Sequence, residues 1–151
     1  MQRSSRGKIP LPIASFYELP ATLLTPAEQR RSICRVIAKA WQVLGEVDIL
    51  CADPETAQAM DDLLWTFQGG AFIPHGIGAD EPVRIHLDCA SMPQSVKALA
   101  LCIEVLPATL PPCERLLDFV PADPQAKAAA RERYRLCKSA GFTMQVHPLE
   151  L

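Results

Sequence analysis

The stretch that decides the fold is VDILCA at positions 47–52, followed directly by Asp53 and Pro54. A short and nearly continuous apolar run of this kind is typical of a strand that is covered on both faces in a parallel sheet. Asp53 and the proline after it predict the start of a helix, because aspartate caps a first helical turn and proline suits the first helical position. A buried strand that runs straight into a helix favours an α/β fold.

A further strand and helix are predicted upstream of this stretch. Residues 13–19 have the apolar character of a strand. Thr25 is followed by Pro26 and Glu28, which is the pattern of a capped helix start, and apolar side chains then recur at helical spacing until Gly45. The first third of the chain is therefore predicted to be strand, helix, strand.

The same alternation continues downstream. A second helix is predicted to end near residues 65–69, and a last helix to run from about Pro124 to Ala140. Further extended segments are predicted at 83–87, 98–105, 116–120 and 142–147. Together these elements predict a three-layer α/β domain with a mostly parallel sheet. We expect residues 1–10 to be a flexible basic leader and residues 11–151 to form this single domain.

Composition limits the classes of partner. The 151 residues carry a formal net charge of -2, so the field of the whole molecule would not attract DNA, and any role with nucleic acid should be indirect. None of the six cysteines belongs to a CxxC pair, which argues against a zinc site. Scattered thiols without a secretory or membrane-spanning segment favour a cytoplasmic protein.

The motifs of nucleotide and metal binding are missing. Residues 18–26, between the first predicted strand and helix, contain no glycine that would let backbone amides approach a phosphate, and no GxxxxGK[ST] motif occurs. The histidines at 75, 86 and 147 lack the spacing that places two ligands on one helix face. The sequence therefore predicts no phosphate-binding loop, no metal and no cofactor.

The last predicted helix gathers positive charge on one side. At about 100° per residue, Lys127, Arg131, Arg135 and Lys138 fall in one sector, with Tyr134 at its edge. Such a strip is often an ordinary solvated face. Its functional interpretation is a site for a peptide carboxylate, since guanidinium groups bind carboxylates at two points and a tyrosine ring adds apolar contact.

Arg133 differs from these cations, because the same helical projection places it among the apolar residues of the helix. A buried arginine needs a carboxylate partner. We expect Arg133 to pair with Asp118 and to be structural.

The second informative region is the aromatic stretch around the end of the second helix. LLWTF at 63–67 leads into GGAFIPHG at 69–76. Trp65 and Phe72 could complete the core, or they could form a protein-protein contact, for which exposed aromatic side chains are typical anchors.

These regions carry a resemblance to a known family. The runs MDDLLWTF (60–67), FIPH (72–75), PVRI (82–85), FVP (119–121), ARERYR (130–135) and AGF (140–142) occur in the order and at the approximate spacing found in the chi subunit of bacterial DNA polymerase III. The chain resembles that family over nearly its whole length after the leader. The resemblance implies a Rossmann-like connectivity without a bound nucleotide, and no catalytic activity of its own.

The resemblance also implies partners. Chi subunits join the clamp loader through the psi subunit and bind the acidic C-terminal tail of single-stranded-DNA-binding protein. Carried over to this sequence, the tail site comprises Lys127, Arg131, Tyr134 and Arg135, with Gly141 and Phe142 nearby. The surface for psi, or alternatively for a helicase-like repair protein, comprises Trp65, Phe72, Pro74 and His75.

Two other functions remain open from the residues alone. An enzyme on the same scaffold, such as a nucleotide-processing hydrolase, could use Asp88 and His75. A direct nucleic-acid binder could use the basic helix.

Overall fold

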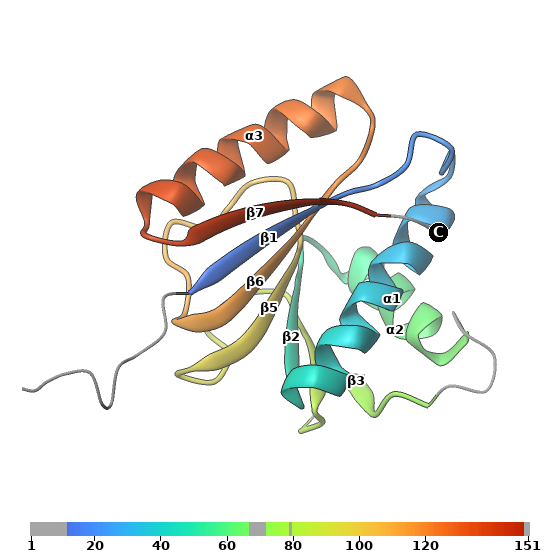
Figure 1. The fold of residues 1–151 in the computed structure, drawn as a ribbon. Coiled ribbons are helices and arrows are strands. Elements are labelled where there is room, and N and C mark those ends of the chain that lie inside the picture. The colour runs from blue at the N-terminus through green and yellow to red at the C-terminus, as the bar shows by residue number, and fades with distance from the viewer. Residues whose placement is uncertain (1–11, 67–71, 79, 150–151) are drawn as a thin grey trace, which may run out of the picture.

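Seven parallel strands form one twisted sheet in the computed structural model, which describes residues 12–66, 72–78 and 80–149 (Figure 1). The strand order is β3-β4-β2-β5-β6-β1-β7, and every pairing is parallel. The strands are β1 (Ile13–Glu18), β2 (Val47–Cys51), β3 (His75–Ile77), β4 (Val83–His86), β5 (Val96–Cys102), β6 (Cys113–Val120) and β7 (Thr143–Pro148). The helices are α1 (Pro26–Leu44), α2 (Pro54–Thr66) and α3 (Pro124–Ser139).

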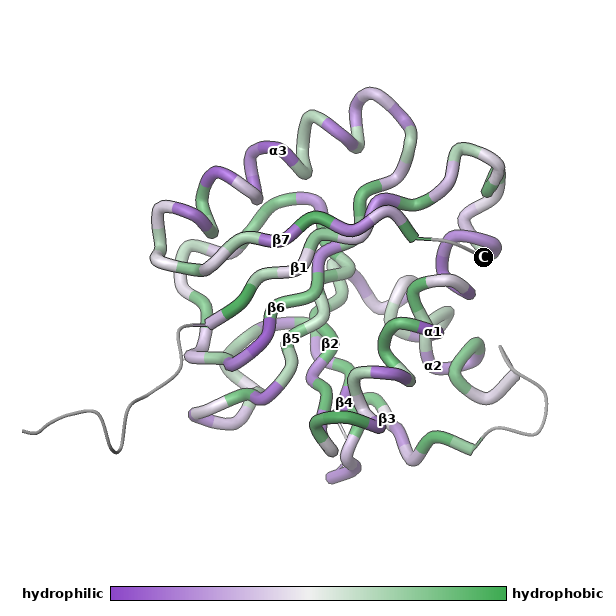
Figure 2. Tube along the Cα trace, in the orientation of Figure 1, coloured by the Kyte–Doolittle hydropathy of each residue, from purple (hydrophilic) through white to green (hydrophobic). Residues whose placement is uncertain are grey.

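The helices make the sheet the middle of three layers. One core cluster joins α1 and α2 to the sheet through residues such as Ile37, Met60 and Leu64, and a second lies beneath α3 around Leu116 and Cys137. All five residues of β2 are buried, as expected of a strand covered on both faces. Hydrophilic segments alternate with more hydrophobic ones along α3, which has one face toward the sheet and one toward solvent (Figure 2).

Local signals in the sequence explain where two helices begin. Thr25 accepts from the Glu28 backbone N–H at 3.1 Å, and the Glu28 carboxylate accepts from the Thr25 backbone N–H at 3.0 Å, which completes a capping box before α1. Gly45 ends this helix with a φ of 85°, a left-handed conformation that glycine adopts without strain. Asp123 caps α3 by accepting from the Ala126 backbone N–H at 3.0 Å.

The predicted α/β fold is confirmed, with differences in the strands. The sheet is wholly parallel, and the strand predicted at 98–105 lies at Val96–Cys102, because the chain then leaves the sheet for a segment with prolines at 107, 111 and 112. The three-residue strand β3 was not predicted, since it is too short to show a periodic pattern. The predicted leader at 1–10 lies outside the described residues.

Candidate functional site

A buried ion pair fixes how α3 lies on the sheet. Arg133 donates from Nε to Oδ2 of Asp118 at 2.6 Å and from Nη2 to Oδ1 at 2.9 Å, and its Nη1 donates to the Glu104 carbonyl at 2.8 Å. The predicted pairing of Arg133 with Asp118 is confirmed. Burial raises the pKa of Asp118 above its ordinary value, although the guanidinium opposes the shift. With Arg133 held inward, Lys127 and Arg131 lie on the exposed side of the helix.

A small pocket opens beside this exposed side. Its volume is about 190 Å³, and it lies where α3 passes over β6, β1 and β7. Most of its lining is apolar or aromatic, from Phe16, Val120, Ala130, Tyr134 and Val146. Its charged lining residues are Lys127, Arg131 and Glu18. The pocket therefore combines an apolar interior with two cations and one anion at its rim.

The tyrosine of the pocket is held by ring packing. The rings of Tyr134 and Phe16 meet edge to face, with centroids 5.3 Å apart. Phe16 is buried in β1 and Val146 is its register partner in β7, so these two residues and Tyr134 form a continuous apolar surface. This lining suits the apolar group of a ligand, with the exposed Lys127 and Arg131 beside it.

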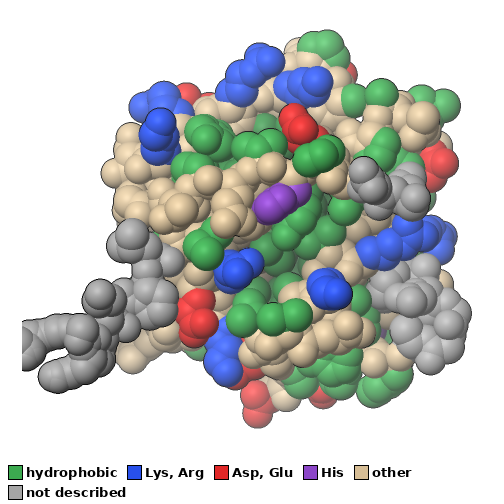
Figure 3. All heavy atoms as spheres, viewed as in Figure 1, with side chains coloured by type: hydrophobic (Ala, Val, Ile, Leu, Met, Phe, Trp, Pro, Cys, Tyr) green, Lys and Arg blue, Asp and Glu red, His purple; other side chains and the backbone are tan. Residues whose placement is uncertain are grey.

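The cations of α3 are not equivalent. Lys and Arg side chains gather along the upper margin of the molecule over α3 (Figure 3). Arg135 donates from Nε to Oε1 of Glu132 at 3.0 Å, and this contact lowers the pKa of Glu132. Neither Lys127 nor Arg131 forms an ion pair with any other residue that the structure describes. Lys127 and Arg131 also line the small pocket, whereas Lys138 does not, so they are the cations best placed to receive an external anion there.

Two of the predicted tail-site residues lie toward the far end of α3. Gly141 follows the helix with a φ of 101°, and its N–H donates to the Lys138 carbonyl at 3.1 Å. Phe142 lines a different and larger cavity of about 1090 Å³, together with Leu136 and Ala140. The structure therefore brings Lys127, Arg131 and Tyr134 together at the small pocket, and it places Gly141 and Phe142 beyond the lining of that pocket.

The four residues of the predicted partner surface form one cluster at the end of α2. Trp65 is 53% exposed and Phe72 is 65% exposed, and their ring centroids are 5.8 Å apart. The Trp65 ring also lies 4.6 Å from the ring of His75, which is buried. His75 is fixed by contacts with the carbonyls of Ile73 at 2.6 Å and Asp61 at 3.0 Å. Pro74 is half-buried between Ile73 and His75. The exposed aromatic pair thus lies beside a buried histidine that is hydrogen-bonded to the backbone.

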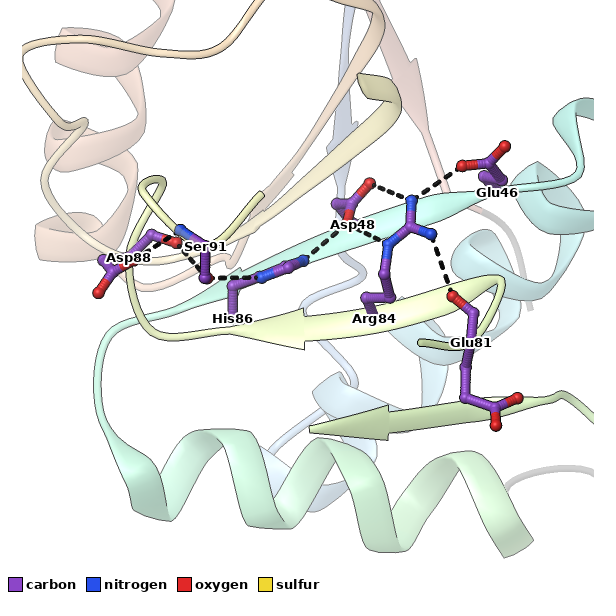
Figure 4. A network of polar contacts seen from close by, with 7 residues as sticks. All are labelled: Glu46, Asp48, Glu81, Arg84, His86, Asp88 and Ser91. Carbon is purple, nitrogen blue, oxygen red and sulfur yellow. Dashed lines mark hydrogen bonds and ion pairs between the residues drawn. The ribbon is translucent and has the colours of Figure 1, made fainter. Parts of the chain in front are cut away.

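A polar network around Asp48 is the other conspicuous group of charged residues (Figure 4). Arg84 binds both oxygens of the buried Asp48, at 2.8 and 2.9 Å, and His86 Nε2 lies 2.6 Å from Oδ1. Burial alone would raise the pKa of Asp48, but hydrogen bonds from Arg84 and His86 outweigh it and hold the pKa below its ordinary value. His86 Nδ1 contacts the Ser91 hydroxyl at 2.8 Å. The polar groups of this network hydrogen-bond to one another, and in doing so they join β2 to β4.

The residues of the alternative hydrolase do not converge. His75 pairs in register with Val83, the first residue of β4, whereas Asp88 lies beyond the last residue of that strand, His86. Both ring nitrogens of His75 contact carbonyl oxygens, while Asp88 accepts from the Ser91 backbone N–H at 3.1 Å. Among the described residues, no group of three or more His, Cys, Asp or Glu side chains could hold a metal ion.

Sequence reasoning missed the strand residues of the small pocket. Phe16, Val120 and Val146 come from three separate strands, and they meet only because β1 lies between β6 and β7. Each is an apolar residue in a predicted extended segment, and no local pattern distinguishes it from the core. Glu18, the charged last residue of β1, was also missed, because its place beside α3 follows from the same strand order.

Comparison with known proteins identifies the family to which these features belong. The family model described as "DNA polymerase III chi subunit, HolC" matches residues 12–145. A Pseudomonas aeruginosa protein named DNA polymerase III subunit chi is 31% identical over 137 residues, which cover 89% of this chain and 94% of that protein. The Escherichia coli K12 protein of the same name is 27% identical over 117 residues, covering 74% of this chain and 80% of that protein.

The fold is also found in a much larger solved structure. The crystal structure of T4 UvsW aligns with a TM-score of 0.55 and 10% sequence identity. The alignment covers 93% of this chain and 42% of the UvsW chain. At this identity the likeness concerns the α/β architecture. No helix in the described part of the chain is both long and apolar enough to cross a membrane.

Proposed function

The chain belongs to the DNA polymerase III chi subunit family, and from that premise we propose that it acts as an adaptor which binds the acidic C-terminal tail of single-stranded-DNA-binding protein. A member of this family is a non-catalytic accessory subunit of the polymerase holoenzyme. In the proposed role the chain links single-stranded-DNA-binding protein to psi and the clamp loader in the cytoplasm, and it meets DNA only indirectly.

The observation that carries the proposal is the small pocket with Lys127 and Arg131 at its rim. The tail implied by the family resemblance is rich in aspartate and ends in phenylalanine, so it offers a ring and a free carboxylate a few ångströms apart. A cavity of about 150 Å³ can hold a benzene ring, so the 190 Å³ of this pocket suffices for one aromatic side chain. The two cations would then bind the terminal carboxylate through charge-assisted hydrogen bonds.

The second partner is assigned to the aromatic cluster of Trp65 and Phe72. Trp65 and Phe72 are exposed and lie next to each other, and exposed aromatic side chains are typical anchors of protein-protein contacts. This cluster belongs to the layer of α1 and α2, whereas the small pocket belongs to the layer of α3, so the two partners could bind together. We assign psi to the aromatic cluster, with a helicase-like repair protein as the alternative occupant.

The proposed tail binding should be weak for one site and strong for the assembly. Exposed ion pairs are screened by salt, so the affinity of one tail should fall as ionic strength rises. Several tails on one tetramer of single-stranded-DNA-binding protein would compensate for this weakness. When one tail dissociates, the other tails are held close to the site at a high effective concentration.

The proposal is tested by calorimetric titration of the protein with single-stranded-DNA-binding protein and with the same protein lacking its last residues. We expect heat of binding only for the intact partner. Equal binding of both forms would overturn the tail assignment. Binding of an oligonucleotide alone, with the affinity of the intact partner, would instead favour the direct nucleic-acid binder.

A further inference from the structure

The exposed edge of β7 offers backbone groups beside the small pocket. β7 is the end strand of the sheet, and in the described part of the chain it pairs only with β1. End strands present unpaired N–H and C=O groups that can bind an extended peptide. Val146 belongs both to this edge and to the pocket lining, and its side chain is 50% exposed.

The pairing with β1 determines which groups of β7 face outward. Thr143 donates its N–H to the Pro12 carbonyl at 2.8 Å, and Leu149 donates to the Glu18 carbonyl at 2.9 Å. In a parallel ladder the residues of a strand alternate between its two neighbours. The N–H and C=O groups of Met144 and Val146 therefore point away from β1, while Pro148 has no N–H to offer.

The cations of α3 follow the same edge. Arg131 to Lys138 spans seven residues of helix, or about 10 Å, which matches about three residues of extended peptide. Because a helix between parallel strands runs against them, Arg131 lies toward the C-terminal end of β7 and Lys138 toward its N-terminal end. A peptide with its carboxylate at Arg131 would place its preceding acidic residues under Arg135 and Lys138.

We propose that the acidic tail binds as an added strand parallel to β7, pairing with the outward N–H and C=O groups of Met144 and Val146 while its last side chain fills the pocket. This inference rests on the proposed function, since it concerns how the same tail is held. In this arrangement, part of the affinity for the tail comes from hydrogen bonds to the backbone of the tail peptide. Arg135 then takes part by leaving Glu132 for an aspartate of the tail.

Peptides with a modified backbone test this directly. The probe is the last eight residues of the cognate single-stranded-DNA-binding protein, with one backbone N–H at a time replaced by N-methyl, and binding is followed by calorimetry. We expect N-methylation at every second position upstream of the terminal residue to weaken peptide binding roughly tenfold. N-methylation at the positions in between should change the affinity little. A flat profile for a series whose unmodified peptide binds would overturn strand addition and leave the proposed function standing. An unmodified peptide that does not bind would overturn both.

A protein variant gives a second readout. Met144→Pro removes one outward N–H of β7 at a position away from the pocket lining, and proline is tolerated where the N–H of an edge strand faces solvent. The matched control is Met144→Ala, which shortens the side chain and keeps the N–H. We expect Met144→Pro to weaken binding roughly fivefold relative to Met144→Ala at a similar melting temperature. Equal affinity of the two folded variants would contradict strand addition.

Discussion

Arg133 of α3 and Asp118 of β6 are joined at two points inside the molecule, with Nε–Oδ2 and Nη2–Oδ1 distances of 2.6 and 2.9 Å. Two residues earlier in the helix, Arg131 is exposed at the rim of the small pocket. Successive helical residues differ by about 100° in direction, so an inward Arg133 requires Arg131 to face outward. The buried pair thus sets the orientation of the helix that carries the proposed tail site.

The first prediction concerns stability. Arg133→Met should lower the free energy of unfolding by about 3–5 kcal/mol, because Asp118 would stay buried without its counter-ion and the Glu104 carbonyl would lose a donor. Urea unfolding measures the change. Arg135→Met is the matched control, since its partner Glu132 is exposed, and it should leave the unfolding curve almost unchanged. Similar small effects of both substitutions would contradict the structural role of Arg133.

The second prediction uses the one acidic residue of the pocket lining. Glu18→Gln removes a negative charge that would repel a terminal carboxylate, so the tail peptide should bind severalfold more tightly. Glu114→Gln makes the same change of net charge at the opposite end of the neighbouring strand β6 and should alter the affinity little. An equal gain in affinity in both variants would mean that the net charge alone controls binding, and it would contradict a binding site beside Glu18.

The third prediction concerns pH. The pKa of Asp48 is held below its ordinary value of 3.8, so its ionised form is favoured by folding. The stabilisation it brings is present above that value and is lost as the pH falls through the lower pKa of the folded state. Asp48→Asn should therefore be clearly destabilising at pH 7, and the destabilisation should shrink as the pH is lowered below 3.8, which urea unfolding over a series of pH values measures. A destabilisation that does not change with pH would contradict this account.

The fourth prediction separates the two surfaces. Trp65→Ala and Phe72→Ala should each weaken binding of psi by tenfold or more, because exposed aromatic anchors contribute a large share of an interface. Both should leave the affinity for the tail peptide unchanged, since the pocket lies under α3. Surface plasmon resonance with immobilised psi, and calorimetry with the peptide, measure the two effects. Normal psi binding by both variants would contradict the assignment of psi to the cluster of Trp65 and Phe72.

Much of the architecture could be predicted, because its signals are local. The apolar run of β2, the capping box at Thr25 and the inward position of Arg133 each depend on neighbours in the sequence. The pocket could be predicted only in its helical half. Phe16, Val120 and Val146 meet through the order of β6, β1 and β7, which no local pattern encodes. The contact of Arg135 with Glu132 was also missed, since exposed side chains three residues apart can point elsewhere.

The most direct measurement is the affinity of Arg131→Ala for the tail peptide, with Arg35→Ala as the matched control. Arg35 is an exposed arginine of α1, in the opposite layer, so its loss changes net charge equally. Calorimetry at low salt should show a loss of at least about tenfold for Arg131→Ala, the size expected for charge-assisted hydrogen bonds to a carboxylate. Arg35→Ala should bind normally, and both proteins should melt close to the unsubstituted chain. Retained affinity in a folded Arg131→Ala protein would contradict the proposed tail site.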